Sequence, residues 1–357
     1  MSVYRSIAEL PVRIDAVEFE GLVRPAQRGG FGRRTTIVRL RGAGATGVGE
    51  DVNYDAGEQK ELVDHGLDLP IRGNRRLGRL ERLLDELDLF GREPRHPEAR
   101  AYRRWAVSSA ALDLALRQQR RPFHHLVGLV PRPVRFVKSM SLGAAASIEP
   151  VSRILRRRPT TRFKLDAGRG WTAATADSLR GTGAVEIVDL KGAYHGTPVD
   201  LAADPALYLT IARGLPDVWL EDPAWNRETR AVLEPFLDRV TWDAPIHSAA
   251  EIEALAPRPR MVNMKPSRFG SLARLFEAYA WCRANGVGMY GGGQFELGPG
   301  RGQIQYLAAL FHPEAPNDVA PTAYHDAETA TDLPPSPLRP APAAAGFAWR
   351  EPQPESR

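Results

Sequence analysis

Two hydrophobic patterns divide the chain near residue 130. In the first part, apolar positions recur every three to four residues in 75–90 and in 99–119, which predicts two amphipathic helices. Stretches 13–23 and 33–42 are instead rich in β-forming residues and are expected to be strands. From residue 134 onward, short apolar runs alternate with helical segments. The chain is therefore expected to contain an α+β region followed by repeated strand–helix units.

The second pattern predicts parallel strands. The apolar runs lie at 134–143, 161–168, 184–192, 217–223, 239–245, 260–266 and 286–293, with helical segments at 201–215, 227–237, 248–256 and 272–286. Seven or eight such units close into a barrel. A doubly wound open sheet would give the same alternation, but the glycine-rich phosphate-binding motif of such sheets does not follow the first strand.

The expected fold class is α/β, with two domains. We predict a (β/α)₇β TIM-like barrel at 131–321 and an α+β capping domain at 1–130, because 357 residues exceed one compact domain. The Pro- and Ala-rich tail, 322–357, is expected to join the cap through its GFAW motif. In the helix predicted at 99–119, three small side chains should admit a neighbouring helix: Ala106, Ser109 and Ala110.

Composition excludes several classes of protein. A net charge of +5 is too small to indicate nucleic-acid binding by itself. The single cysteine, Cys282, excludes an internal disulfide and suits a reducing compartment. No run approaches the ~20 apolar residues that a membrane helix needs. We expect a cytoplasmic homo-oligomer with neither a nucleic-acid nor a membrane partner.

Acids and lysines follow the predicted barrel strands. Asp189, Glu221 and Asp243 end three consecutive strands, and the carboxyl ends of barrel strands meet on one face. Three such carboxylates form an oxygen cluster suited to Mg²⁺, with Mn²⁺ as an alternative. Lys164 and Lys265 flank this cluster and are expected to act as catalytic groups on a carbon acid held between them.

The motifs around these residues resemble those of the enolase superfamily, in its muconate-lactonizing-enzyme-like branch. They read FKLD at Lys164, VDLK at Asp189, WLEDP at Glu221, TWDAP at Asp243 and NMKPSRFGSL at Lys265. The resemblance is closest to the o-succinylbenzoate synthase and N-acylamino acid racemase type. It implies a Mg²⁺-dependent lyase or racemase/epimerase that abstracts the proton α to the carboxylate of a small substrate. The resulting enediolate would be stabilised by the metal.

A glycine-rich segment adds substrate-binding candidates. The sequence YGGGQFELGPGR at 290–301 resembles a segment at the seventh and eighth strands of the same superfamily. The expected substrate-binding residues are Asn263, Gly292, Gly293 and Glu296. Glu50 belongs to another glycine-rich stretch, which is expected to be a cap loop that closes over the substrate.

Two positions depart from the superfamily pattern. Asp166 stands where the second lysine of a Lys-x-Lys motif is usual, and Lys191 replaces the Asn of an Asp-x-Asn motif. Neighbouring strands lie about 4.8 Å apart, so these two side chains can touch. Lys191 could serve as the missing catalytic base with Asp166 orienting it, or its ammonium could partly stand in for the metal. Alternatively, the two form a structural ion pair in a catalytically altered or inactive barrel that has a binding role.

Overall fold

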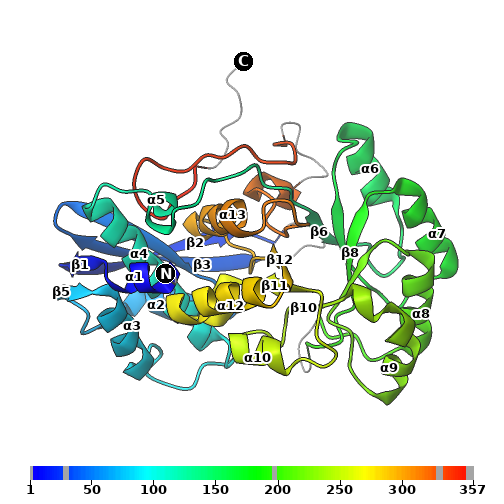
Figure 1. The fold of residues 1–357 in the computed structure, drawn as a ribbon, viewed down its shortest axis with the longest axis horizontal. Helices are drawn as coiled ribbons and strands as arrows, with labels where there is room; N and C mark the ends of the chain where they lie inside the picture. Colours follow the sequence, from blue (N-terminus) through cyan, green and yellow to red (C-terminus); the bar gives the residue numbers. More distant parts are fainter. Residues whose placement is uncertain (1–2, 27–31, 195–198, 327–332, 351–357) are drawn as a thin grey trace.

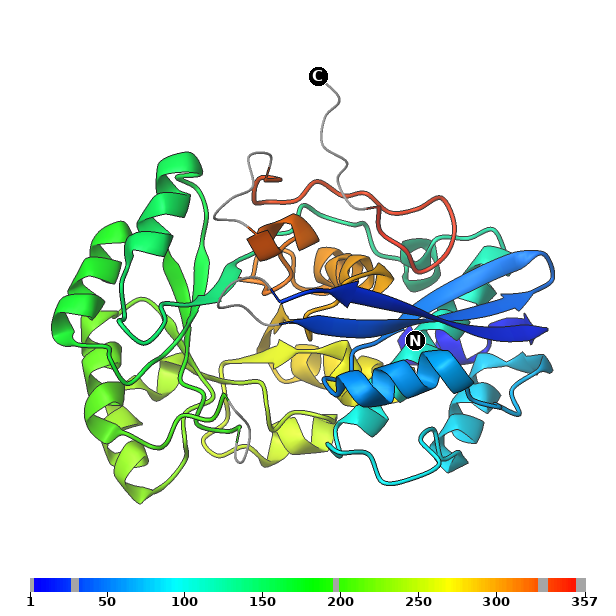
Figure 2. The same cartoon turned by 180° about the vertical axis from the view of Figure 1, so that it is seen from behind.

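The computed structural model describes residues 3–26, 32–194, 199–326 and 333–350. A cap and a barrel lie side by side, with the cap in blue and cyan and the barrel strands and helices in green to orange (Figure 1). Seen from behind, the antiparallel sheet of the cap and one of its helices lie in front (Figure 2).

The described part of the cap contains two antiparallel sheets and five helices. Its larger sheet has the order β2-β3-β4, and β1 pairs with β5 in the smaller one. The strands are β1 (Pro11–Ile14), β2 (Ala16–Arg24), β3 (Arg33–Gly42), β4 (Ala45–Asp51) and β5 (Gly73–Arg76). The helices are α1 (Val3–Ala8), α2 (Ala56–His65), α3 (Leu77–Glu86), α4 (Ala99–Gln118) and α5 (Phe123–Val127).

Helix α4 packs closely on strand β4. A Cβ atom on Gly49 would lie 2.0 Å from the carbonyl oxygen of Ala106, so only glycine allows this approach. The prediction that the small residues of α4 admit another helix is therefore wrong at this point, because they face a strand. The glycines at 44–55 suggested a loop, but in the structure Gly47 and Gly49 allow strand β4 to approach helix α4. Accordingly, Glu50 lies in β4 with 1 % of its surface exposed, and not in a loop over the substrate.

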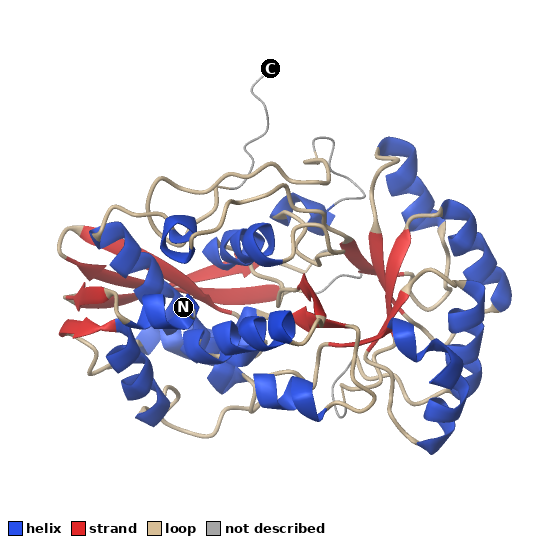
Figure 3. Ribbon diagram, viewed as in Figure 1, coloured by secondary structure: helices blue, strands red, loops and turns tan. Residues whose placement is uncertain are grey.

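The barrel strands form one parallel sheet in the order β6 to β12. All lie within the apolar runs that predicted them: β6 (Lys138–Ser141), β7 (Phe163–Asp166), β8 (Val185–Asp189), β9 (Trp219–Glu221), β10 (Val240–Trp242), β11 (Met261–Met264) and β12 (Gly288–Gly291). These strands are short, whereas the cap has long ones (Figure 3).

A short segment at 317–318 takes the eighth position of the ring. Asn317 forms a parallel bridge with Phe136, just before β6, and Asp318 forms one with Gly292, just after β12. The segment thus joins the two edges of the seven-stranded sheet. The predicted (β/α)₇β barrel with an α+β cap is confirmed.

Helices follow the barrel strands and cover the sheet. They are α6 (Glu149–Arg157), α7 (Ala173–Thr182), α8 (Pro205–Gly214), α9 (Arg227–Leu233), α10 (Ala249–Ala254), α11 (Pro266–Phe269), α12 (Leu272–Ala284) and α13 (Pro299–Phe311), with 3₁₀ turns η1 (Glu234–Arg239) and η2 (Thr322–Asp326). Among the helices of the described residues, none combines the length and apolar character needed to cross a bilayer.

The C-terminal tail returns to the cap, as its red trace shows (Figure 1). The backbone N–H of Phe347 donates to Oδ1 of Asp113 in α4 at 2.7 Å, and the Phe347 side chain is fully buried. The GFAW motif therefore packs on the cap side of the molecule.

Candidate active site

The predicted acids meet at the carboxyl ends of the barrel strands. Asp166, Asp189 and Glu221 are register partners on β7, β8 and β9, so they stand side by side along one edge of the sheet. Asp243 directly follows β10, and Lys265 directly follows β11. Ile187, Met261 and Tyr290 form a separate hydrophobic cluster. Because Ile187 and Met261 precede the site residues Asp189 and Asn263 by two strand positions, we place this cluster on the barrel interior below the polar site.

Lys164 lies between two of the acids. Its Nζ donates to Oε1 of Glu221 and lies 3.4 Å from Oδ2 of Asp189, and both Lys164 and its partners are buried. Asp318, at the eighth position of the ring, has Oδ2 3.8 Å from the same nitrogen. The other oxygen of Glu221 accepts a hydrogen bond from the Tyr290 hydroxyl. Each oxygen of Glu221 therefore has a hydrogen-bonding partner in the protein.

Lys191 bridges the two acids on the neighbouring strands. Its Nζ lies 2.6 Å from Oδ2 of Asp189 and 3.1 Å from Oδ1 of Asp166. The expectation that Asp166 and Lys191 can touch is thus met by the geometry. A catalytic role for this pair stays a prediction.

A second cluster of donors surrounds Asp243. Its Oδ2 lies 2.6 Å from Lys265 Nζ and 3.5 Å from Arg268 Nη2, and it accepts a hydrogen bond of 2.9 Å from the Tyr194 hydroxyl. Among the described residues, Oδ1 of Asp243 is buried and has no hydrogen-bond partner.

Asp222 belongs to the acid cluster but is held by the backbone. Its two oxygens accept the N–H groups of Asp243 and Ala244 at 2.8 and 2.9 Å. Its φ of 48° is left-handed, which is uncommon for a residue other than glycine. Asp222 therefore fixes the backbone that presents Asp243.

The site holds more acidic than basic groups, and their crowding and burial shift the pKa values of the acids. Burial raises the pKa of Glu221 to about 8, and nearby acids add to this while Lys164 opposes it. Burial likewise opposes ionisation of Asp189, but Lys191 and Lys164 outweigh it and lower its pKa to about 2. Acids outnumber cations in the site: Asp166, Asp189, Glu221, Asp222 and Asp243 against Lys164, Lys191, Lys265 and Arg268.

The residues present fit a divalent cation. Asp189, Glu221 and Asp222 each offer an oxygen, and these atoms all lie within 4.8 Å of one another. The predicted third acid, Asp243, is not in this close set, because its carboxylate turns toward Lys265 and Arg268. Its unpartnered Oδ1 nevertheless remains available to a ligand. Hard oxygen donors with excess negative charge are what Mg²⁺ prefers.

Two of the predicted substrate-binding residues, Asn263 and Gly292, lie beside Lys265. Both side-chain polar atoms of Asn263 are buried and lack a hydrogen-bond partner among the described residues. A Cβ atom on Gly292 would lie 2.5 Å from Asn263 Oδ1 and 2.8 Å from Lys265 Cε, so glycine keeps this space open. Gly293 directly follows, where a Cβ would lie 2.3 Å from Glu296 Oε2.

Glu296 is already engaged by the protein. Its carboxylate pairs with Arg301 at 3.0 Å and accepts the N–H of Gln294 at 2.7 Å. Nearby, Glu50 of the cap accepts N–H groups at the start of α13, from Leu297 at 2.6 Å and Gly300 at 2.9 Å. The loop after β12 is thus fastened to the cap, and substrate binding by Glu296 stays a prediction.

Several residues that complete the site were not predicted from the sequence. Tyr290 precedes Gly292 by two strand positions, and Asp222 follows Glu221 directly, so alternation and adjacency could have suggested both. Tyr194 and Arg268 lie in the segments after β8 and β11, where no periodic pattern indicates direction. Asp318 was missed because its segment is too short to read as a strand.

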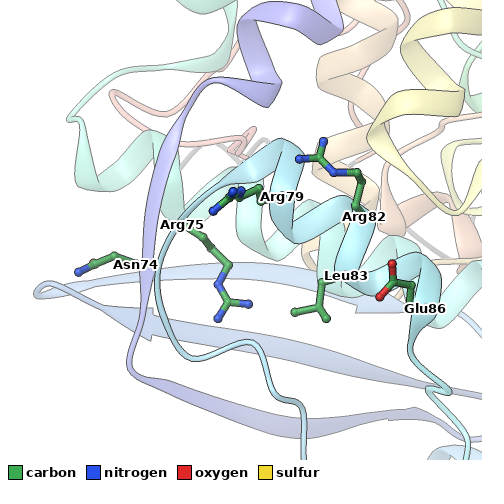
Figure 4. A pocket seen from close by; sticks show the side chains of 6 residues that line it. All are labelled: Asn74, Arg75, Arg79, Arg82, Leu83 and Glu86. Carbon is green, nitrogen blue, oxygen red and sulfur yellow. The ribbon is translucent and has the colours of Figure 1, made fainter.

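A hollow of about 530 Å³ lies on the cap, away from the barrel mouth. Figure 4 shows its lining, which comes from β5 and α3: Asn74, Arg75, Arg79, Arg82, Leu83 and Glu86. The guanidinium groups of Arg75 and Arg82 point in different directions in this view. The hollow takes no part in the acid cluster.

Both domains of the chain match a known protein family. Residues 5–126 match the N-terminal domain, and residues 130–326 the C-terminal domain, of a family described as a domain of unknown function, DUF8230. The chain belongs to the DUF8230 family. The C-terminal match alone covers more than half of the chain, including every strand of the barrel sheet.

This DUF8230 member is similar in sequence to a racemase, and in fold it resembles solved structures of the enolase superfamily. The N-succinylamino acid racemase of Thermus thermophilus is 25% identical over 347 residues, covering 87% of this chain and 86% of the relative. A dipeptide epimerase from Enterococcus faecalis has a TM-score of 0.66 at 15% identity, over 94% and 99% of the two chains. Muconate lactonizing enzyme from Pseudomonas putida has a TM-score of 0.62 at 17% identity, over 86% and 88%. The two solved structures support the fold alone.

Proposed function

We propose that this protein is a divalent-metal-dependent enzyme that abstracts the proton α to the carboxylate of a small substrate. The observation that carries the proposal is the placement of Lys164 and Lys265. They come from the second and sixth strands of a ring with eight positions, so they stand on opposite sides of its mouth. A carbon acid held between two amines can lose a proton to one and receive a proton from the other.

The acid cluster supports a role for a metal. Asp189, Glu221 and Asp243 would hold Mg²⁺ or Mn²⁺, with Asp222 fixing the backbone of Asp243. When bound, the cation would supply positive charge that stabilises the developing negative charge of the substrate carboxylate and relieves the lysines of ion pairing with these acids. Asn263 would then donate to or accept from the substrate, because its carboxamide lies beside Gly292, as Lys265 does, and has no hydrogen-bond partner among the described residues.

Racemisation or epimerisation is the reaction that this arrangement favours. Proton return to either face needs a proton carrier on each side, which Lys164 and Lys265 provide. The similarity to an N-succinylamino acid racemase makes N-succinylamino acids the first substrates to try. Dehydration of the o-succinylbenzoate synthase type would start with the same proton abstraction but would expel a leaving group.

The experiment is proton exchange in D₂O. N-succinylated L- and D-amino acids are incubated with the protein and Mg²⁺, and the α-proton signal is followed by NMR. We expect exchange with inversion, and we expect Lys164→Ala and Lys265→Ala each to slow exchange by about 10²–10⁴-fold, chiefly for opposite enantiomers. Lys60→Ala, which removes an exposed lysine of α2, is the matched control and should leave exchange unchanged.

Other outcomes are equally decisive. An alkene product without exchange into recovered substrate would identify a dehydratase for the compound tested. If folded protein exchanges no α-proton in a broad panel of N-acylamino acids with either Mg²⁺ or Mn²⁺, the proposed racemase or epimerase is wrong.

A further inference from the structure

Lys191 places an ammonium group directly on an acid of the proposed metal site. Its Nζ lies 2.6 Å from Oδ2 of Asp189, and its backbone N–H donates to Oδ1 of the same carboxylate at 3.0 Å. One residue therefore engages both oxygens of Asp189. Only 16% of the Lys191 side-chain surface is exposed.

The backbone and the neighbouring side chains hold Lys191 in this position. Its φ of 53° is left-handed, a conformation that costs free energy for a residue with a Cβ. The ammonium lies 4.9 Å from the centroid of the Tyr194 ring, and the Tyr194 hydroxyl in turn donates to Asp243. The surroundings thus compensate a strained backbone and aim the side chain at Asp189.

A cation bound by Asp189 would conflict with this ammonium. Mg²⁺ sits about 2.1 Å from a ligand oxygen, so it would lie within a few ångströms of Lys191 Nζ if both used Oδ2. Two positive charges at that separation in a buried site repel strongly. Asp166 offers the ammonium an alternative, since its Oδ1 is 3.1 Å away and its side chain is 32% exposed.

We propose that Lys191 is a built-in counter-ion that competes with the divalent cation for Asp189 and so lowers the affinity of the site for metal. Lys191 remains charged throughout and shifts its contact from Asp189 to Asp166 when the metal binds. The acid and the lysine that depart from the superfamily pattern thus act as one unit. This inference rests on the proposed metal-dependent function.

The test is Mg²⁺ binding by calorimetry, with metal-free unfolding as a second readout. We expect Lys191→Met to bind Mg²⁺ at least about tenfold more tightly than the wild type, and Lys191→Arg, which keeps the charge, to bind no more tightly. Lys60→Met removes an exposed lysine and should change nothing. In EDTA, Lys191→Met should melt at a lower temperature than the wild type, and saturating Mg²⁺ should narrow that difference.

The possible failures are distinguishable. Equal or weaker Mg²⁺ binding by Lys191→Met, with the wild type binding normally, overturns the competition and leaves the proposed function standing. Binding by neither folded protein overturns both. Should Lys191→Met not fold, Lys191→Gln keeps a polar side chain of lower bulk and is judged by the same affinity comparison.

Discussion

The imidazole of His312 and the side-chain carbonyl of Asn317 lie 2.6 Å apart, and this contact fastens the segment that closes the barrel. Asn317 Nδ2 lies within hydrogen-bonding distance of three backbone carbonyls, and its Oδ1 also accepts the N–H of Gly291. Because Oδ1 only accepts, Nδ1 of His312 must carry a proton. Its Nε2 then accepts from the Tyr279 hydroxyl, 3.0 Å away.

This arrangement predicts a pH-dependent stability. Burial lowers the pKa of His312 from 6.5 to about 4, although the hydrogen bond to Asn317 opposes the shift. The folded state thus keeps His312 neutral while the unfolded chain binds a proton below about pH 6.5. The stability contributed by neutral His312 is complete above that pH and falls by roughly 3 kcal/mol as the pH drops toward 4.

Unfolding in guanidinium at pH 7, 6 and 5 checks this prediction. His312→Gln should be less stable at pH 7 and should lose less stability than the wild type between pH 7 and 5. His65→Gln, an exposed histidine of α2, is the control with the same substitution. Parallel pH profiles for the wild type and His312→Gln would contradict the assignment.

Removing Glu50 should loosen the joint between cap and barrel. Glu50→Ala leaves the N–H groups of Leu297 and Gly300 without their acceptor in a mostly buried place, which costs about 1–3 kcal/mol of unfolding free energy. Glu20→Ala removes an exposed carboxylate that pairs with Arg39 and should cost less than about 1 kcal/mol. Equal losses in denaturant unfolding would show that Glu50 does not clamp the two parts.

Two glycine substitutions should distinguish an effect on the active site from an effect on the stability of the fold. Gly292→Ala puts a methyl group against Asn263 and Lys265, and we expect it to reduce α-proton exchange by at least about tenfold. Gly181→Ala, in helix α7 with open space at its Cβ position, should stabilise the protein by about 0.5–1 kcal/mol and leave exchange intact. Normal exchange by Gly292→Ala would mean that this space is not used by substrate.

Neutralising Asp243 and Asp222 separately should identify the third metal ligand. Both oxygens of Asp222 are occupied by backbone N–H groups, whereas Oδ1 of Asp243 has no hydrogen-bond partner among the described residues. Asp243→Asn should therefore weaken Mg²⁺ binding by about tenfold or more, and Asp222→Asn by less. The reverse order in calorimetry would assign the role to Asp222 instead.

Local patterns were sufficient for much of the barrel. Each strand of the parallel sheet lies inside the apolar run that predicted it, because a buried parallel strand is a short apolar stretch whatever its neighbours are. The convergence of Asp189 and Glu221 also followed from the sequence, since parallel strands bring their carboxyl ends together.

Long-range packing decided the rest. Strand β4 was predicted to be a glycine-rich loop. Its glycines instead allow close contact with helix α4, which lies far away in the sequence. The eighth position of the barrel depends on bridges from Asn317 and Asp318 to two distant segments.

Residue type and spacing were enough to predict the order of the strands and the kinds of charge that meet at their ends. Which oxygen pairs with which donor became clear from the folded molecule alone. In the structure, Asp243 pairs with Lys265, Asp222 accepts a hydrogen bond from a backbone N–H group, and Lys191 pairs with Asp189. The reason is that side-chain direction and burial depend on backbone angles and neighbours that no local pattern records.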